Sequence, residues 1–309
     1  MANISRRKFI KSIGLCTILT ATGNIHDGLS FVPSHLNIQN EKQRLSSVPN
    51  GFTHPENTDR NLFIGVGNPG LKISNALQTG IKTIGAFADE SISIQQFSPN
   101  NNQINGFISE AQIIFLIGSM KDKDFWIARE LILSHNIFLL YTIVIEDKNP
   151  LLSAHSFPVN EKEGCIFISE KHYEQQAVLT IHSLFSMLMV PGLVGIDGND
   201  IKSTVGGKSG FMVHTVSSYV NSFSAFKQTI WTYKTLIKSS SSLLLHIMYD
   251  EKIDCTMDDL TNISDTLHYG CSSDTEVLWA CTDALKIGVD FRATLFISVN
   301  QTKKTIRRY

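Results

Sequence analysis

Residues 171–212 read KHYEQQAVLTIHSLFSMLMVPGLVGIDGNDIKSTVGGKSGFM, and they predict the central helix of the fold and the loop that follows it. Its first half carries apolar residues at steps of three and four, which places them on one face of a helix. From Leu184 onward apolar residues surround the helix axis, a pattern typical of a buried helix. We therefore predict a core helix over residues 171–190, ~28 Å long and about as wide as a domain. The residues of its apolar face are Ala177, Val178, Ile181, Leu184, Phe185, Leu188 and Met189.

The core helix is predicted to end at Pro191 and Gly192. A proline disfavours the helical conformation of the residue before it, and a glycine frees the backbone. The loop that follows reads GIDGND and carries two acids three residues apart, Asp197 and Asp200. The stretch therefore predicts a central strut between two domains that delivers two carboxylates to a surface loop. Asp residues in such a loop also favour helix-capping positions, so a purely structural role stays open.

A glycine-containing loop follows the first predicted strand. Residues 61–70 read NLFIGVGNPG, a short buried strand that runs into the loop, and a helix is expected over residues 71–79. The spacing G-x-G-x-x-G is typical of loops whose backbone N–H groups approach a phosphate at a helix N-terminus. Pro69 removes one such donor, and glycine turns that only reverse the chain remain an alternative. The glycines of the pattern are Gly65, Gly67 and Gly70.

A second strand is expected over residues 82–87, with Asp89 at its end. Dinucleotide-binding folds place an acid about twenty residues after the glycine loop, where it binds a ribose. This position keeps a nicotinamide-dependent oxidoreductase of the Rossmann type among the candidate functions.

The remaining elements predict an α/β protein. A strand, a helix and a strand in succession imply a parallel sheet that is covered on both faces. The second half of the chain alternates helices and strands as an α+β domain, and residues 146–164 are interpreted as a short polar loop region. The predicted strands cover residues 112–117, 137–145, 211–216, 243–249, 275–281 and 290–299, and the predicted helices residues 126–135, 219–238 and 257–269.

Residues 190–197, VPGLVGID, and residues 200–203, DIKS, resemble the core helix and the following loop of FtsZ, the bacterial tubulin-like cell-division GTPase. In that family the loop reads roughly V-P-G-L-I-N-V-D-F-A-D-V. The resemblance runs from about Asn61 to Val299, although Gly195 stands where the family has Asn. It implies a tubulin/FtsZ-like fold with a parallel-sheet nucleotide-type domain, a long core helix and a smaller C-terminal α+β domain.

The same resemblance implies roles for individual residues. In the family the two loop acids, here Asp197 and Asp200, complete the GTPase site of the next subunit in a filament and polarise the attacking water. The chain would then form a homo-oligomer or filament. GTP or GDP would bind at the loops that follow the first strands. The positions implied for nucleotide binding are Gly65, Gly67, Asn68, Gly70, Asp89, Gly118 and Ser119.

The loop after the strand over residues 112–117 departs from the family pattern. FtsZ has G-G-G-T-G-T-G there, whereas residues 118–124 read GSMKDKD and only Gly118 matches. Side chains replace glycines that approach phosphate oxygens, and Asp122 and Asp124 would repel a phosphate. Lys121 and Lys123 could bind an anion in another way. The sequence therefore predicts a degenerate GTP site, and an active FtsZ-like GTPase with an altered second loop is the alternative.

The N-terminus resembles a twin-arginine export signal. Residues 5–11 read SRRKFIK, with Arg6 and Arg7 as the arginine pair, and an apolar segment and small residues follow. We expect the export machinery to move a folded protein to the periplasm or outside. If the arginine pair is only part of a basic tail, the protein is cytoplasmic.

Composition excludes several classes of function. The 27 basic and 28 acidic residues balance, which excludes bulk nucleic-acid binding. The sequence contains no uncharged apolar run of 18 residues, so no transmembrane helix is predicted. The five cysteines form no C-x-x-C pair, no H-E-x-x-H occurs, and no metal site is expected. Residues 206–210, GGKSG, fail as a P-loop because Lys202 stands at the first glycine position.

The sequence thus favours a divergent tubulin/FtsZ-like protein that acts by self-assembly or as a structural partner. The alternatives are an active cell-division GTPase and an exported oxidoreductase. The expected divisions are a leader (1–23), a linker (24–60), a nucleotide-type domain (61–170), the core helix (171–190), a loop and connection (191–216), an α+β domain (217–300) and a basic tail (301–309).

Overall fold

The computed structural model describes residues 60–81, 92–99, 103–146, 150–171, 173–190, 192–285 and 289–299. The predicted leader, most of the linker, the strand over residues 82–87, Asp89 and the tail lie outside these residues. What the sequence predicts for them stays a prediction.

The strands of the described residues form one nine-stranded sheet in the order β2-β1-β3-β4-β5-β6-β9-β7-β8. Strands β1 to β6 are parallel, β9 is antiparallel to both β6 and β7, and β8 is parallel to β7. The strands are β1 (Arg60–Gly65), β2 (Ile92–Gln96), β3 (Ala111–Gly118), β4 (Leu139–Glu146), β5 (Glu163–Ser169), β6 (Lys208–Ser217), β7 (Ser242–Asp250), β8 (Glu276–Leu285) and β9 (Phe291–Val299).

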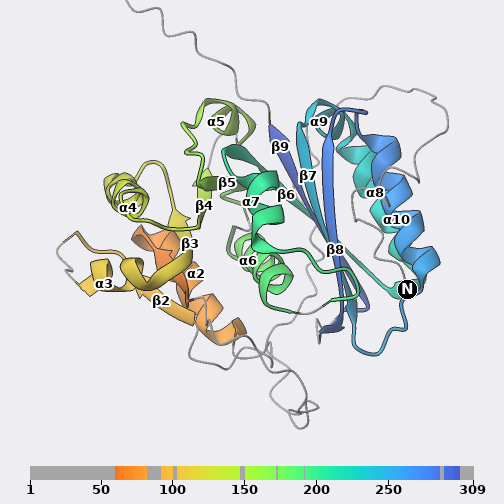
Figure 1. Cartoon of the computed structure of the whole chain (residues 1–309), viewed down its shortest axis with the longest axis horizontal. Helices are drawn as coiled ribbons and strands as arrows, with labels where there is room; N and C mark the ends of the chain where they lie inside the picture. The colour runs from red at the N-terminus through yellow and green to blue at the C-terminus, as the bar shows by residue number, and fades with distance from the viewer. Residues whose placement is uncertain are drawn as a thin grey trace, which may run out of the picture.

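Helices cover both faces of this sheet. Successive side chains of a strand point to opposite faces, and along these strands the side chains of both faces are buried. Figure 1 shows α2 beside the first strands, α6 and α7 at the middle of the sheet, and α8 beside α10 against its second half. One face packs against α2 (Gly67–Ile81), α6 (Tyr173–Met189) and α7 (Gly198–Val205); the other packs against α3 (Gln103–Glu110), α4 (Lys123–Leu133), α5 (Pro150–Ser156), α8 (Ser222–Thr232), α9 (Lys234–Ser239) and α10 (Met257–Gly270).

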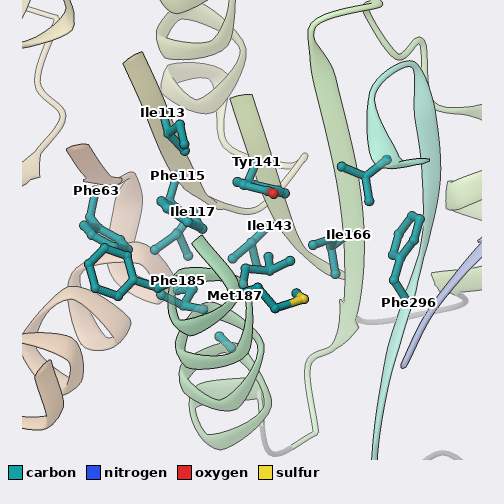
Figure 2. Close-up of a cluster of buried hydrophobic side chains, with 14 of the residues drawn as sticks. Phe63, Ile113, Phe115, Ile117, Tyr141, Ile143, Ile166, Phe185, Met187 and Phe296 are labelled. Atoms are coloured by element: carbon teal, nitrogen blue, oxygen red, sulfur yellow. The ribbon is translucent and has the colours of Figure 1, made fainter. Parts of the chain in front are cut away.

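The core helix is confirmed as α6, and it is buried. Phe185 lies among aromatic side chains from the strands, where Phe63 and Phe115 stack with ring centroids 4.6 Å apart and Phe115 stacks on Tyr141 at 4.9 Å. Figure 2 shows this cluster, with Met187 of α6 directed toward the sheet. The apolar face predicted from the sequence therefore anchors α6 on the parallel strands.

The part of α6 that faces the C-terminal strands packs against polar side chains instead. His246 on β7 lies within hydrogen-bond distance of Ser183 (2.9 Å) and Thr282 (3.0 Å). His214 on β6 has equivalent distances of 3.2 Å to Thr180 and 3.1 Å to Thr294. Burial, together with the nearby charge of Arg292, lowers the pKa of each of these histidines to about 3.

The structure corrects the loop predicted over residues 146–164. This segment contains α5 and the first residues of β5. Helix α5 is only seven residues long and is held by burial of Pro150 and Ala154, so it has too few turns to show a helical period in the sequence. The helix predicted over residues 219–238 is also divided, because it ends at Thr232 and resumes at Lys234.

Candidate functional site

The parallel half of the sheet has a topological switch point between β1 and β3. The chain leaves β1 toward β2 on one side and later returns to β3 on the other, so the loops after β1 and β3 diverge from neighbouring strands. Ligands of open α/β sheets bind at such points, beyond the carboxyl ends of the strands. The glycine loop and the Gly118 loop both lie here, so the structure brings these two groups of candidate residues together.

The first loop is short because α2 begins within it, at Gly67. Gly67 has φ of +63°, a conformation that glycine adopts without strain. Pro69 lies in the first helical turn, where its missing N–H breaks no intrahelical hydrogen bond. The helix therefore starts four residues earlier than the sequence predicted, and Asn68 lies exposed in its first turn.

The other two glycines of this loop permit close packing between β1, α2 and β3. A Cβ atom on Gly70 would come within 2.6 Å of the carbonyl oxygen of Ile117 and 2.7 Å of the carbonyl carbon of Gly65. A Cβ atom on Gly65 would come equally close to the carbonyl oxygen of Gly70, at 2.6 Å. These positions need glycine for packing alone, whether or not a ligand binds.

The second loop is fixed by side chains. Ser119 and Asp122 close a turn with a backbone hydrogen bond of 3.0 Å, and the indole N–H of Trp126 donates to the carbonyl of Met120 at 2.9 Å. Asp122 is the N-cap of α4, where its carboxylate accepts a hydrogen bond of 2.9 Å from the backbone N–H of Asp124. Capping of this kind satisfies a helix N–H that has no partner within the helix.

Asp122 also connects the two loops. Its second carboxylate oxygen lies directly over Gly67, where a Cβ atom would overlap it. One half-buried carboxylate thus caps α4 and lies against the first residue of α2. Both helix N-termini carry a partial positive charge, so the site already holds a negative charge where helix dipoles attract anions. The sequence identified Asp122 as repulsive to phosphate but did not reveal its contact with Gly67. Its capping role could have been predicted, because an Asp just before a helix is a known N-cap signal.

The loop acids Asp197 and Asp200 lie at the opposite edge of the sheet. Asp197 is the N-cap of α7 and accepts a hydrogen bond of 2.9 Å from the backbone N–H of Asp200, and the Asp200 carboxylate accepts from the Asp197 N–H at 3.4 Å. This is a capping box, the structural role that the sequence left open. Gly198 packs against Phe138, the residue just before β4, which places α7 at the amino ends of the parallel strands.

Within one chain, the two loop acids and the glycine loops are therefore separated by α6. A helix of 17 residues spans roughly 25 Å, so neither Asp197 nor Asp200 reaches the glycine loops. A bridge to β8 fixes the loop before α7, because Val194 and Cys281 exchange backbone hydrogen bonds of 3.0 and 3.3 Å. The remaining candidate, Asp89, lies outside the described residues.

A polar cavity of about 370 Å³ opens at the far end of α4 from the two loops. Its lining includes Arg129 and Pro158, and the guanidinium of Arg129 is already bonded to Glu163 (2.6 and 2.8 Å) and to the carbonyl of Pro158 (2.6 Å). In the described part of the chain, no three His, Cys, Asp or Glu side chains gather to hold a metal ion. Nor does any helix there have the length and hydropathy to cross a bilayer.

Comparison with solved structures shows the fold. FtsZ of M. jannaschii matches with a TM-score of 0.58 at 11% identity, over 78% of this chain and 91% of that chain. An empty FtsZ dimer of the same organism matches with a TM-score of 0.55 at 12% identity, over 78% and 88%. GDP-bound CetZ1 from Haloferax volcanii matches with a TM-score of 0.50 at 12% identity, over 79% and 95%. The chain therefore has a tubulin/FtsZ-like fold.

At the level of sequence, no family model and no curated protein matches the chain. Identities near one in nine support the fold and not an activity.

Proposed function

We propose that this chain is a tubulin/FtsZ-like protein that does not hydrolyse GTP efficiently and acts by self-assembly or as a structural partner. The observation that carries the proposal is the Asp122 carboxylate, which lies over Gly67 and caps α4 where the two loops meet. A phosphate at this position would meet Asp122 and Asp124 in place of backbone N–H groups, and like charges at short range repel.

Self-assembly is supported by the opposite placement of the two groups of charges. The exposed Lys121 and Lys123 flank Asp122 at the carboxyl edge of the sheet, and the exposed Asp197 lies at the amino edge. A head-to-tail contact between copies brings these edges together and repeats into a filament. Such a contact would be complementary in charge without a nucleotide, and the solved FtsZ dimer with no ligand is consistent with assembly of this kind.

An active GTPase is the second candidate, and the first loop favours it. Gly67 starts α2 in the conformation that phosphate-binding loops use, and the Gly67 and Asn68 N–H groups have no partner within the helix. Under this alternative Asp200 would position the attacking water on a neighbouring copy. Replacing Asp200 with Ala would then abolish hydrolysis and leave nucleotide binding unchanged.

Export of the folded chain is part of the proposal, since little GTP is present outside the cytoplasm. The arginine pair carries this inference. Replacing Arg6 and Arg7 with Lys should keep the full chain in the cytoplasm, as cell fractionation would measure. An unchanged distribution between compartments would contradict export by this route.

Analytical ultracentrifugation of the full chain, with and without GTP, tests self-assembly. We expect concentration-dependent assembly that GTP does not alter. Lys121→Glu/Lys123→Glu should weaken it, and so should Asp197→Asn, which removes the charge but keeps a good helix cap. Lys227→Glu/Lys238→Glu, at exposed positions on the helices that cover one face of the sheet, is the matched control. Assembly that requires GTP would contradict the proposal and restore the GTPase, and a chain that stays monomeric would leave only the role as a structural partner.

A further inference from the structure

The charges of the chain are unevenly distributed along the second half. No Asp or Glu occurs between Asp200 and Asp250, although the whole chain is nearly neutral. The same segment holds five lysines, Lys202, Lys208, Lys227, Lys234 and Lys238. Three of them lie on α8 and α9, which cover the C-terminal strands. This part of the fold is therefore locally basic.

Helices α8 and α9 present a row of apolar and basic side chains away from the sheet. Phe226, Ile230 and Ile237 face the core and are buried. The opposite side has Trp231 at 62% exposure, Phe223 at 42% and, one turn earlier, Val220 at 88%. We name this row the α8–α9 face; its members recur at steps of three and four and are Val220, Phe223, Lys227, Trp231, Lys234 and Lys238.

The lysines of this face lie beside its aromatic rings. The Nζ atom of Lys234 is 4.0 Å from the centre of the Trp231 ring, and that of Lys227 is 5.9 Å from the centre of the Phe223 ring. The face thus alternates flat apolar groups with flexible cationic ones. In water an exposed Trp and an exposed Phe gain nothing from this position, whereas at a lipid headgroup layer the rings enter the interface and the ammonium groups reach the phosphates.

We propose that the α8–α9 face docks on the surface of an anionic lipid bilayer. Charge complementarity favours this partner, because the lysines match lipid phosphates while Trp231 and Phe223 bury in the interface. The acids of the neighbouring helix, Asp258 and Asp259, lie in the first turn of α10, next to Tyr219, whose hydroxyl donates to Asp259 at 2.8 Å. The closest contact with lipid is therefore expected at the other end of the face, at Trp231 and Lys234.

Co-sedimentation of the full chain with vesicles tests this docking. We expect binding to vesicles of phosphatidylcholine with phosphatidylglycerol, no binding to phosphatidylcholine alone, and weakening by salt. Lys227→Gln/Lys234→Gln should reduce partitioning on the order of twentyfold. The control Lys171→Gln/Lys252→Gln removes two exposed charges elsewhere and should have little effect. The N-terminal leader is common to all variants, so differences between them report the face.

Tryptophan fluorescence gives a second readout. Trp126 and Trp279 are half-buried, so a blue shift on vesicle addition should come from Trp231 and disappear in Trp231→Phe. Equal loss of binding in both lysine pairs would overturn the proposal, because binding would then follow net charge alone. Absence of vesicle binding at low salt would also overturn it. If the face variants instead changed sedimentation of the protein without lipid, the face would be a contact between copies and not a lipid surface.

Discussion

The two loops at the carboxyl edge of the parallel strands are fixed by different means. The β1–α2 loop depends on glycines, since Gly65 and Gly70 approach backbone atoms that leave no room for a Cβ atom. The β3–α4 loop depends on side chains, with Asp122 as a helix cap and Trp126 bonded to the backbone of Met120. The first loop keeps backbone N–H groups at a helix start, and the second fills the adjacent space with a carboxylate. Two neighbouring loops at one edge of the sheet are thus held in different ways, the first by close backbone packing and the second by side-chain contacts.

The largest expected effect is that of acid on the stability of the whole fold. It sets the pH range in which the two loops can be compared. His182 of α6, His214 of β6 and His246 of β7 have pKa values lowered to about 3, mainly by burial. An unfolded His titrates near pH 6.5. The stability that the neutral, buried histidines contribute is therefore complete above that pH and is lost as the pH falls toward 3. Each His should then lower the free energy of unfolding by about 1.4 kcal/mol per pH unit. Urea denaturation between pH 7 and 4 measures this slope, and His246→Gln should make it less steep; a flat profile would contradict the burial of these groups.

Breaking the buried ion pair that anchors α4, at the end of the helix far from the second loop, should have the next largest effect. Arg129 of α4 and Glu163 of β5 are 5% and 0% exposed and are joined at 2.6 Å. Glu163→Gln leaves a buried guanidinium uncompensated, which costs about 3–5 kcal/mol. Glu130 is the control, because it contacts the same guanidinium at 3.0 Å but is 72% exposed, so Glu130→Gln should cost less than about 1 kcal/mol. Similar midpoints for both variants in chemical denaturation would show that α4 is not anchored by the buried pair.

A double-mutant cycle sharpens the comparison at the point where the loops touch. Gly67→Ala places a Cβ atom against Asp122 and in a left-handed conformation, and should cost about 2–3 kcal/mol. Asp122→Ala removes the α4 cap and should cost about 1 kcal/mol. Because the second change also removes the overlap, the double variant should be more stable than the sum predicts, by about 1 kcal/mol. Strict additivity would show that the two loops do not meet.

The smallest expected effect concerns the acids at the opposite edge. Asp197→Ala should lower the free energy of unfolding by about 1 kcal/mol through loss of the α7 cap, whereas Asp197→Asn should change it by less than about 0.5 kcal/mol. Thermal unfolding of the two variants separates the capping role from the charge. An equal loss in both would mean that the charge, and not the cap, stabilises this loop.

Those parts of the fold that depend on local patterns could be predicted from the sequence. The period of Ala177, Ile181 and Leu184 gave α6, and the apolar runs gave most of the strands. Helix α5 and strand β5 were not predicted, because α5 is only two turns long and β5 follows it after only six residues. The start of α2 was placed four residues too late, because residues 65–70 were interpreted as a glycine loop, whereas the first helical turn begins at Gly67 and tolerates Pro69.

The site was less accessible to sequence reasoning, because its decisive contact joins residues far apart in the chain. Gly67 and Asp122 meet only because β1 and β3 are neighbours in the sheet, which no local pattern reveals. The acids Asp197 and Asp200 could be recognised from their spacing, and their capping box is visible in the order of residues. Whether they also act on a neighbouring copy depends on a contact between chains.

Isothermal titration calorimetry at neutral pH, which measures equilibrium binding of nucleotides to the full chain, tests whether the two loops form a nucleotide site. With Asp122 over Gly67, we expect no saturable binding of GTP or GDP, and none of NAD. Saturable binding of GTP to the unaltered chain would contradict the account and restore an active GTPase, and saturable binding of NAD would indicate an oxidoreductase instead.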